Sequence, residues 1–317
     1  MTRIDVAMLA YGGPVSVADV GPFIEAMTGA APAPGLLAAV VGRYETIGGG
    51  SPLPAITRRQ AAALQAALTV RFGDGVRVRP GFLYCSPTVG QCLAELDAPD
   101  TVVLPMSPYS SRLTTGAYRA ALAAAGRGEL PLVDGWHVDP RYLTALGRLI
   151  SETLDGADPE AFAVLFTAHN VPRETVAGGD PYVDQLQETV AQLLPALMPG
   201  DWRLAFQSKG RRGGEWLAPE AASAVRELAA AGWKNLLVVP MGFVADHVET
   251  FYDLDIELRE VVEACGMQFL RSRALNDSPP FIEALAGIVA DYLVGRSNAP
   301  PVAGEPDGPL SSGPPRP

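Results

Sequence analysis

The sequence predicts an α/β protein built from two similar doubly wound halves, each with a four-stranded parallel sheet. Two observations lead to this prediction: short apolar, β-branched runs recur along the chain, and longer Ala/Leu-rich stretches with helical periodicity separate them. The 317 residues are enough for two domains of ordinary size. The strand candidates are residues 4–12, 76–84, 101–107 and 131–138, then 161–168, 202–208, 235–243 and 267–272. Helices are expected between them, for instance at 57–71, 112–125, 182–197, 218–231 and 279–294.

The break between the halves is expected near residues 140–160. This gives an N-terminal half over residues 1–145 and a C-terminal half over residues 146–295. Residues 296–317 are rich in Pro, Gly and Ser and show no apolar periodicity. We expect them to form a disordered tail that takes no part in the chemistry.

Composition excludes several classes of protein. The net charge of −11, from 24 basic and 35 acidic residues, argues against a nucleic-acid surface. The three cysteines are irregularly spaced and predict neither a disulfide framework nor a zinc or iron–sulfur site. The apolar stretches are too short to span a bilayer, and the N-terminal run is too short for a signal peptide. We therefore expect a monomer in the cytoplasm, without stable membrane insertion.

Polar residues follow several of the predicted strands, and ligands of such sheets bind beyond the carboxyl ends of the strands. His169 comes directly after the strand at 161–168, so this position favours a functional role, although a lone histidine is more often structural. His247 opens an acidic helix and is as well placed to orient a neighbour as to do chemistry. His137, at another strand end, is the weakest candidate of the three. The polar strand ends read "YGGP", "SPYSS", "TAHN", "QSKG" and "GFVADH".

The stretch "DHVETFYDLDIELRE", residues 246–260, predicts an amphipathic α-helix with an acidic flank. At about 100° per residue its four carboxylates share roughly 80° of arc. Such a flank is either a solvated face or a line of ligands for a cation, and the spacing alone leaves both open. His169 with Glu249 would offer a nitrogen and an oxygen that can bind a divalent metal loosely or accept protons near pH 7. The flank consists of Glu249, Asp253, Glu257 and Glu260.

Two loops could hold an anionic or flat ligand. The glycines of "YETIGGGSPLPAIT", residues 44–57, allow close approach of the backbone, although a flexible connector would read the same. No Gly-Lys-Ser/Thr ending follows, so this is not a phosphate loop, and a nucleotide-binding protein is disfavoured. The hydroxyls and Arg112 of "SPYSSRLTTGAYR", residues 107–119, suit carboxylate or phosphate anchoring, although helix capping explains part of the pattern.

Taken together, these stretches resemble the ferrochelatase family, enzymes that insert ferrous iron into a porphyrin. The resemblance covers about residues 6–290, in the family's order, and implies two flavodoxin-like halves with an active-site cleft between them. Its most specific part is "AHNVP…GDPY" followed at the right separation by "DHVETFYDLDIE". The other matching stretches are "YGGPVSVADVGPFI", "RYETIGGGSPL", "SPYSS" and "FQSKGRRGGEWLAPE".

The resemblance implies roles for particular residues. His169 matches the catalytic histidine and Glu249 the acid that faces it across the porphyrin, while Asp253 and Glu257 match acids that continue outward as a metal path. These four residues are the expected metal ligands. His247 is expected to orient a neighbouring site residue without touching the substrates itself. The expected porphyrin-binding residues are Tyr11, Arg43, Tyr44 and Ser51, together with Ser110, Ser111 and Arg112 of the hydroxyl-rich loop.

The resemblance also bears on the substrates. Fe²⁺ is expected as a substrate and no cofactor is required, because the cysteine set that holds a [2Fe-2S] cluster in some relatives is missing. Tyr11 in "LAYGGP", with "AFQSKG" and "WLAPE", favours coproporphyrin III over protoporphyrin IX. Two departures are Gly13, where threonine is commoner in that branch, and Asn170 after the histidine.

Two other classes of function stay open. One is a cobalt or nickel chelatase that acts on another tetrapyrrole, which the presence of only three histidines disfavours. The other is a non-catalytic haem or porphyrin carrier, which would bind its ligand without metallation.

Overall fold

The computed structural model describes residues 3–210 and 213–298, in which strands and helices alternate along the chain. The strands are β1 Ile4–Ala10, β2 Val76–Phe82, β3 Asp100–Pro105, β4 Ala163–His169, β5 Asp201–Gln207, β6 Asn235–Val239 and β7 Gln268–Arg271. The α-helices are α1 Val20–Thr28, α2 Pro34–Thr46, α3 Leu53–Phe72, α4 Val89–Ala94, α5 Thr115–Ala124, α6 Pro140–Leu154, α7 Arg173–Ala177, α8 Tyr182–Leu197, α9 Ala221–Ala230, α10 Arg259–Ala264 and α11 Pro279–Asn298. Short 3₁₀ turns lie at η1 Val17–Asp19 and η2 Pro159–Ala161, and a π-helix, η3, covers Glu249–Leu258.

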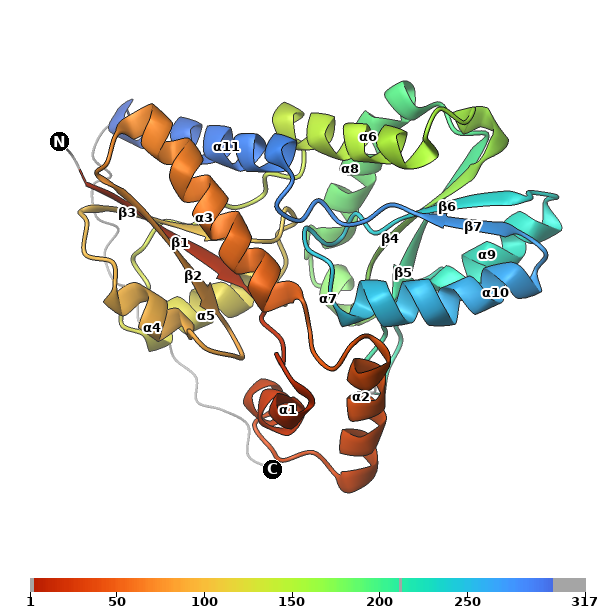
Figure 1. The fold of residues 1–317 in the computed structure, drawn as a ribbon, viewed down its shortest axis with the longest axis horizontal. Helices are drawn as coiled ribbons and strands as arrows, with labels where there is room; N and C mark the ends of the chain where they lie inside the picture. The colour runs from red at the N-terminus through yellow and green to blue at the C-terminus, as the bar shows by residue number, and fades with distance from the viewer. Residues whose placement is uncertain (1–2, 211–212, 299–317) are drawn as a thin grey trace.

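The strands form two separate parallel sheets, which lie side by side in Figure 1. The first has the order β2-β1-β3 and the second the order β5-β4-β6-β7. The central strand β1 is buried along its whole length, as expected of a parallel strand covered on both faces. The prediction of two doubly wound α/β halves is confirmed.

The fourth strand predicted for the first half, residues 131–138, is wrong. Only Leu132 makes a bridge, to Val103 of β3. Beyond it the chain turns away, because Gly135 has a φ of +66° and the carboxylate of Asp134 accepts a hydrogen bond from the Ser110 hydroxyl at 2.6 Å. The first sheet therefore has three strands within the described residues, and the other seven strand predictions are confirmed.

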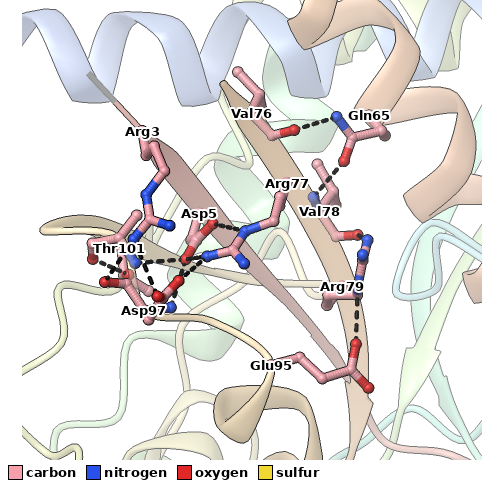
Figure 2. Close-up of polar contacts among 11 residues, drawn as sticks. Arg3, Asp5, Gln65, Val76, Arg77, Val78, Arg79, Glu95, Asp97 and Thr101 are labelled. Atoms are coloured by element: carbon pink, nitrogen blue, oxygen red, sulfur yellow. Dashed lines mark hydrogen bonds and ion pairs between the residues drawn. The ribbon is translucent and has the colours of Figure 1, made fainter. Parts of the chain in front are cut away.

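A buried carboxylate ties the strands of the first sheet together at their amino ends (Figure 2). Asp5 of β1 is fully buried and receives two hydrogen bonds from the Arg77 guanidinium of β2, at 2.8 and 2.7 Å. The backbone N–H groups of Asp97 and Ala98, which precede β3, also donate to it at 2.8 and 2.7 Å. Four donors around one carboxylate compensate for its removal from water. The amino ends of the strands lie opposite their carboxyl ends, where the polar residues of the predicted site gather.

One hydrophobic core runs through both halves, with buried residues from both sheets in a single cluster. The last helix, α11, packs against α3 of the first half and against α6, along the upper side of Figure 1. Helix α6 itself lies across the boundary expected at residues 145 and 146. Helix α11 continues to Asn298, so the first residues of the expected tail are helical. The rest of that tail lies outside the described residues.

Helices α1 and α2 lie apart from both sheets, at the lower side of Figure 1. Val20, Ile24 and Tyr44 form a small buried cluster there, against which Val248 of the second half packs. Val248 directly precedes η3, so α2 reaches the acidic segment of the second half. No helix in the part of the chain that the structure describes combines the length and the apolar composition needed to cross a bilayer.

Candidate active site

The structure brings His169 and Glu249 together, as the sequence predicted. His169 is the last residue of β4 and Glu249 is the first residue of η3. The imidazole Nδ1 lies 3.0 Å from the Glu249 Oε2. The His169 side chain is 43% exposed and that of Glu249 is 25% exposed, so a ligand can reach the pair from solvent.

Each member of the pair stabilises the charged form of the other. Burial lowers the pKa of His169, but the charge and hydrogen bond of Glu249 raise it by more, and the net pKa lies above its ordinary value. Burial raises the pKa of Glu249, but His169 and His247 lower it by more, and the net pKa lies well below its ordinary value. Both directions favour an imidazolium facing a carboxylate.

Neighbouring side chains fix the backbone on both sides of the pair. The Tyr182 hydroxyl donates to the carbonyl oxygen of His169 at 3.1 Å. Gln207, which pairs with His169 in the sheet, donates from its amide Nε2 to the carbonyl oxygen of Glu249 at 2.9 Å. Because these bonds run to the backbone, they hold the positions of both side chains without using their reactive atoms.

His247 lies beside Glu249. Its Nε2 is 3.8 Å from the Glu249 Oε2, and its Nδ1 is 3.2 Å from the carbonyl oxygen of Ala245. The ring packs edge-on against Phe243, with centroids 4.6 Å apart. Both histidines therefore face the same oxygen of Glu249, and His169 is the closer of the two.

The acidic stretch is a π-helix from Glu249 to Leu258, so the α-helical geometry expected for it is wrong. A π-helix closes its hydrogen bonds from i to i+5 and has more than four residues per turn. Residues four apart therefore stay nearly in line along the axis, and Glu249, Asp253 and Glu257 still form one row. Glu260 lies in the following helix, α10.

Arg43 of α2 lies on the outer two acids of this row. Its Nη1 is 3.1 Å from the Asp253 Oδ1, and its Nη2 is 3.1 Å from the Glu257 Oε1. Burial raises the pKa of Asp253 to about 6, against the lowering effects of Ser208 and Arg43. The Ser208 hydroxyl donates to the Asp253 Oδ2. Arg43 holds two carboxylates of the protein in this structure, and its contact with a porphyrin carboxylate remains a prediction.

The four predicted metal ligands therefore fall into two groups. His169 and Glu249 contact each other. Asp253 and Glu257 both contact Arg43. Among the described residues, no three His, Cys, Asp or Glu side chains are arranged so that they could hold a metal ion. Any metal bound by the row would need these contacts to exchange.

Tyr11 and Tyr44 lie around the same acids. Tyr11 follows β1, is 41% exposed, and packs edge-on against Tyr84 with ring centroids 4.7 Å apart. Burial raises the pKa of Tyr11, and the charges of Tyr84 and Glu249 add to the rise. Burial also raises the pKa of Tyr44, helped by the charges of Glu249 and Asp253. Both phenols are therefore neutral at pH 7, and the charge of Glu249 contributes to the raised pKa of each.

Ser51 lies against the "YGGP" loop that carries Tyr11. Its N–H donates to the carbonyl oxygen of Pro14 at 2.7 Å. A Cβ atom at Gly13 would come within 2.8 Å of the Ser51 side chain, and one at Gly50 would overlap the carbonyl oxygen of Val15. The glycine-rich loop therefore packs tightly on the loop after β1.

The hydroxyl-rich loop after β3 bonds to the second half of the molecule. The Ser111 hydroxyl and the Arg112 N–H donate to the Asp180 Oδ2 at 3.1 and 2.7 Å, and the Arg112 guanidinium donates to the carbonyl oxygen of Gly178 at 2.7 Å. The Ser110 N–H donates to the side chain of Gln185 at 2.7 Å. These contacts join the two halves, and the proposed contact of Ser110, Ser111 and Arg112 with a porphyrin remains a prediction.

Sequence reasoning missed three residues of the site, Gln207, Ser208 and Tyr84. The signal for the first two was present, because "QSKG" is one of the polar strand ends. Tyr84 is the last residue of the predicted strand 76–84, and nothing in that strand pattern marks it as a site residue. Hollows of about 370 and 510 Å³ lie elsewhere, between α6 and α11, and do not include these residues.

Comparison with known proteins identifies the family. A family model described as Ferrochelatase matches residues 3–293. A curated protein named Ferrochelatase from Herpetosiphon aurantiacus is 33% identical over 296 residues, which cover 90% of this chain and 97% of that protein. Another of the same name, from a Picosynechococcus species, is 36% identical over 324 residues, with 92% of this chain and 83% of that protein covered.

Solved structures share the fold at lower identity. CbiX, described as the terminal enzyme for biosynthesis of siroheme in denitrifying bacteria, has a TM-score of 0.56 at 18% identity and covers 91% of this chain and 99% of its own. SirB from Bacillus subtilis with Fe³⁺ has a TM-score of 0.58 at 14% identity and covers 93% and 98%. At these identities the likeness concerns the fold alone. From the family model and the curated relatives, the chain belongs to the ferrochelatase family and is an enzyme that inserts metal into a porphyrin.

Proposed function

We propose that this chain inserts Fe²⁺ into coproporphyrin III, with His169 and Glu249 as the residues that act on the macrocycle. The observation that supports these roles is the imidazole–carboxylate pair at 3.0 Å, which joins the carboxyl end of β4 to the start of the acidic row. Tyr11 supports the choice of porphyrin, because tyrosine at this position of "LAYGGP" is the form that resembles the coproporphyrin-type enzymes.

The pair is suited to removing the pyrrole protons. Metallation breaks two N–H bonds of the porphyrin, and the incoming Fe²⁺ replaces the two positive charges that leave as protons. His169 first releases its own proton to solvent, which its 43% exposure allows. Its neutral imidazole then accepts one pyrrole proton, passes it to solvent, and accepts the second in the same way. Glu249 holds the imidazole in place and stabilises the imidazolium that forms.

The acidic row is suited to bringing the metal to the pair. Asp253 and Glu257 continue outward from Glu249 along η3, on a protein whose net charge is already −11. Their field raises the local concentration of cations, and carboxylate oxygens can replace water in the metal's shell. Bending of the macrocycle exposes the pyrrole nitrogens, so a site complementary to the bent form lowers the barrier.

The porphyrin assignment is tested by adding Fe²⁺ anaerobically to the purified protein with either porphyrin and following the absorbance. We expect insertion into coproporphyrin III. Insertion into protoporphyrin IX alone would contradict the choice of substrate. Tight porphyrin binding without metallation would favour a carrier, and turnover with cobalt or nickel on another tetrapyrrole would favour the other chelatase class.

The role of His169 is tested by His169→Ala, which should abolish insertion while porphyrin binding survives. His137→Asn is a matched control, because His137 forms a similar imidazole–carboxylate pair, with its Nε2 2.8 Å from the Glu188 Oε2, away from this site. Retained turnover in His169→Ala, or an equal loss in the control, would contradict the proposed role.

A further inference from the structure

Arg271, the last residue of β7, is a buried cation that contacts the segment carrying Glu249. Its side chain is only 9% exposed. Its Nε and Nη2 donate to the two oxygens of Asp255 at 2.6 and 2.5 Å, and its Nη1 donates to the Asp246 Oδ1 at 3.2 Å. Asp246 precedes Glu249 in the chain and Asp255 follows it. One guanidinium therefore holds this segment on both sides of the residue that faces His169, and Arg271 with these two acids is called the Arg271 clamp.

Further hydrogen bonds connect the Arg271 clamp to the first half of the molecule. The Asn276 Nδ2 donates to the Asp246 Oδ2 at 2.7 Å, and the Asp246 N–H donates to the Asn276 Oδ1 at 2.9 Å. Gln60 of α3 donates from its Nε2 to the carbonyl oxygens of Asn276 and Val244, at 2.8 and 3.3 Å. Both Gln60 and Asp246 are buried. Residues of both halves therefore set the position of Asp246, and Arg271 joins that position to Asp255 in η3.

We propose that Arg271 is a positioning residue for metal insertion: by holding Asp246 and Asp255, it fixes the direction in which the Glu249 carboxylate faces His169. The inference rests on the proposed function of this pair. Arg271 acts through the backbone of residues 246–255 and does not itself contact either substrate.

The winding of η3 explains why such a clamp is needed. A π-helix usually occurs as a single turn, whereas this one covers ten residues, Glu249–Leu258. An α-helix turns by about 100° per residue, and a helix with more than four residues per turn turns by less than about 90°. Over the six residues from Glu249 to Asp255, a change to α-helical winding would rotate one side chain against the other by roughly 60° or more. By holding Asp255, Arg271 therefore favours the winding in which Glu249 faces His169.

The test compares Arg271→Lys with the wild type, both as full-length proteins, at a temperature below the unfolding transition of each. Lysine keeps the positive charge that compensates the two acids, but its single ammonium cannot reproduce the two parallel bonds to Asp255. We expect kcat for Fe²⁺ insertion to fall by about tenfold or more, because a displacement of about 1 Å at a reacting group can cost a factor of about 100. The dissociation constant of the porphyrin should not change.

Amide hydrogen exchange, followed by mass spectrometry, provides a readout that does not depend on activity. Peptides that cover Glu249–Leu258 should exchange faster in Arg271→Lys than in the wild type, because η3 has lost the contact that holds its winding. Asp255→Asn removes the carboxylate at the other side of the contact while keeping its size. It should lower kcat and speed this exchange in the same way, also if Arg271→Lys does not fold.

Arg77→Lys is the matched control. Arg77 makes the same kind of contact, with two bonds to the buried Asp5 and one to Asp97, at the amino ends of the strands of the first sheet (Figure 2). The control should lower the free energy of unfolding without changing kcat or the exchange of η3.

An unchanged kcat in a folded Arg271→Lys or Asp255→Asn protein would overturn the inference. An equal fall of kcat in Arg77→Lys would also overturn it, since it would indicate a general effect of stability, and so would a loss confined to porphyrin binding. The proposed function is judged separately by iron insertion in the wild type. Absence of insertion with the faster exchange of η3 intact would refute the function alone, and normal insertion that the variants retain would refute the role of Arg271 alone.

Discussion

Replacing Glu249 with glutamine removes the charge that faces His169 and keeps a side chain of the same size. The carboxylate is the chief cause of the raised pKa of His169, through both its charge and its hydrogen bond. Asp253 adds a smaller rise and stays in place. The substitution should therefore lower the pKa of His169 without returning it fully to the value set by burial.

The size of the change follows from the geometry of the pair. Two unit charges 4 Å apart interact by about 1 kcal/mol in water and by about 4 kcal/mol at the effective dielectric of a protein surface. The Nδ1–Oε2 distance is 3.0 Å, but the His169 side chain is 43% exposed, so solvent screening brings the value toward the lower figure. We expect a loss of about 1.4 kcal/mol, which lowers the pKa of His169 by about one unit.

Proton NMR of the imidazole signals measures this directly, because the chain has only three histidines. The His169 titration should shift down by about one pH unit in Glu249→Gln. The signals of His137, which pairs with Glu188, should be the same in both proteins. A His169 titration that stays in place or moves up would refute the view that this carboxylate holds the imidazolium.

Four further predictions follow from the charges described above. Because the pKa of His169 is raised, the imidazolium persists to higher pH than usual, so kcat/KM for metal insertion should rise with pH up to that pKa and level off above it, as measured by initial rates from about pH 6 to about pH 9. Stability should change in the opposite direction: the contribution of this pair is fully present below the unfolded pKa near 6.5 and is lost as pH rises through the folded value. Asp253→Asn with Glu257→Gln should raise the apparent KM for iron several-fold with the porphyrin KM unchanged, and an unchanged iron KM would mean that these acids only face solvent. Asp5→Asn should lower the free energy of unfolding by about 2–3 kcal/mol in a urea titration, because the amide cannot satisfy all four donors, and a loss under about 0.5 kcal/mol would contradict the importance of this buried contact with Arg77.

Most of the fold could be predicted because the apolar periodicity of a strand or helix depends only on residues close together in the sequence. The segment 131–138 failed because Gly135 takes a left-handed backbone conformation and Asp134 bonds to Ser110, and neither is visible in the apolar pattern of "PLVDGWHV". The π-helix at Glu249–Leu258 has the same apolar pattern as an α-helix would. Contacts from Gln207 and Ser208, more than 40 positions earlier in the chain, hold its first turn.

The pairing of His169 with Glu249 could be predicted because both follow strands of one parallel sheet, whose carboxyl ends share an edge. The position of Arg43 could not be predicted in this way. It lies on a helix outside both sheets, 210 positions before Asp253. Val248 packs against the buried cluster that contains Tyr44, which brings α2 to the acidic segment, and that contact has no local signal in the sequence.

The packing of α11 on α3 and α6 has a consequence for synthesis on the ribosome. Helix α3 ends at Phe72, and the helix that covers it ends at Asn298, so 226 residues must be added before the first half is complete. At roughly 5–20 residues per second, this takes about 10–45 seconds. During that interval the surface of α3 that contacts α11 is without its native cover, which makes the nascent chain a candidate for chaperone binding until α11 has been synthesised.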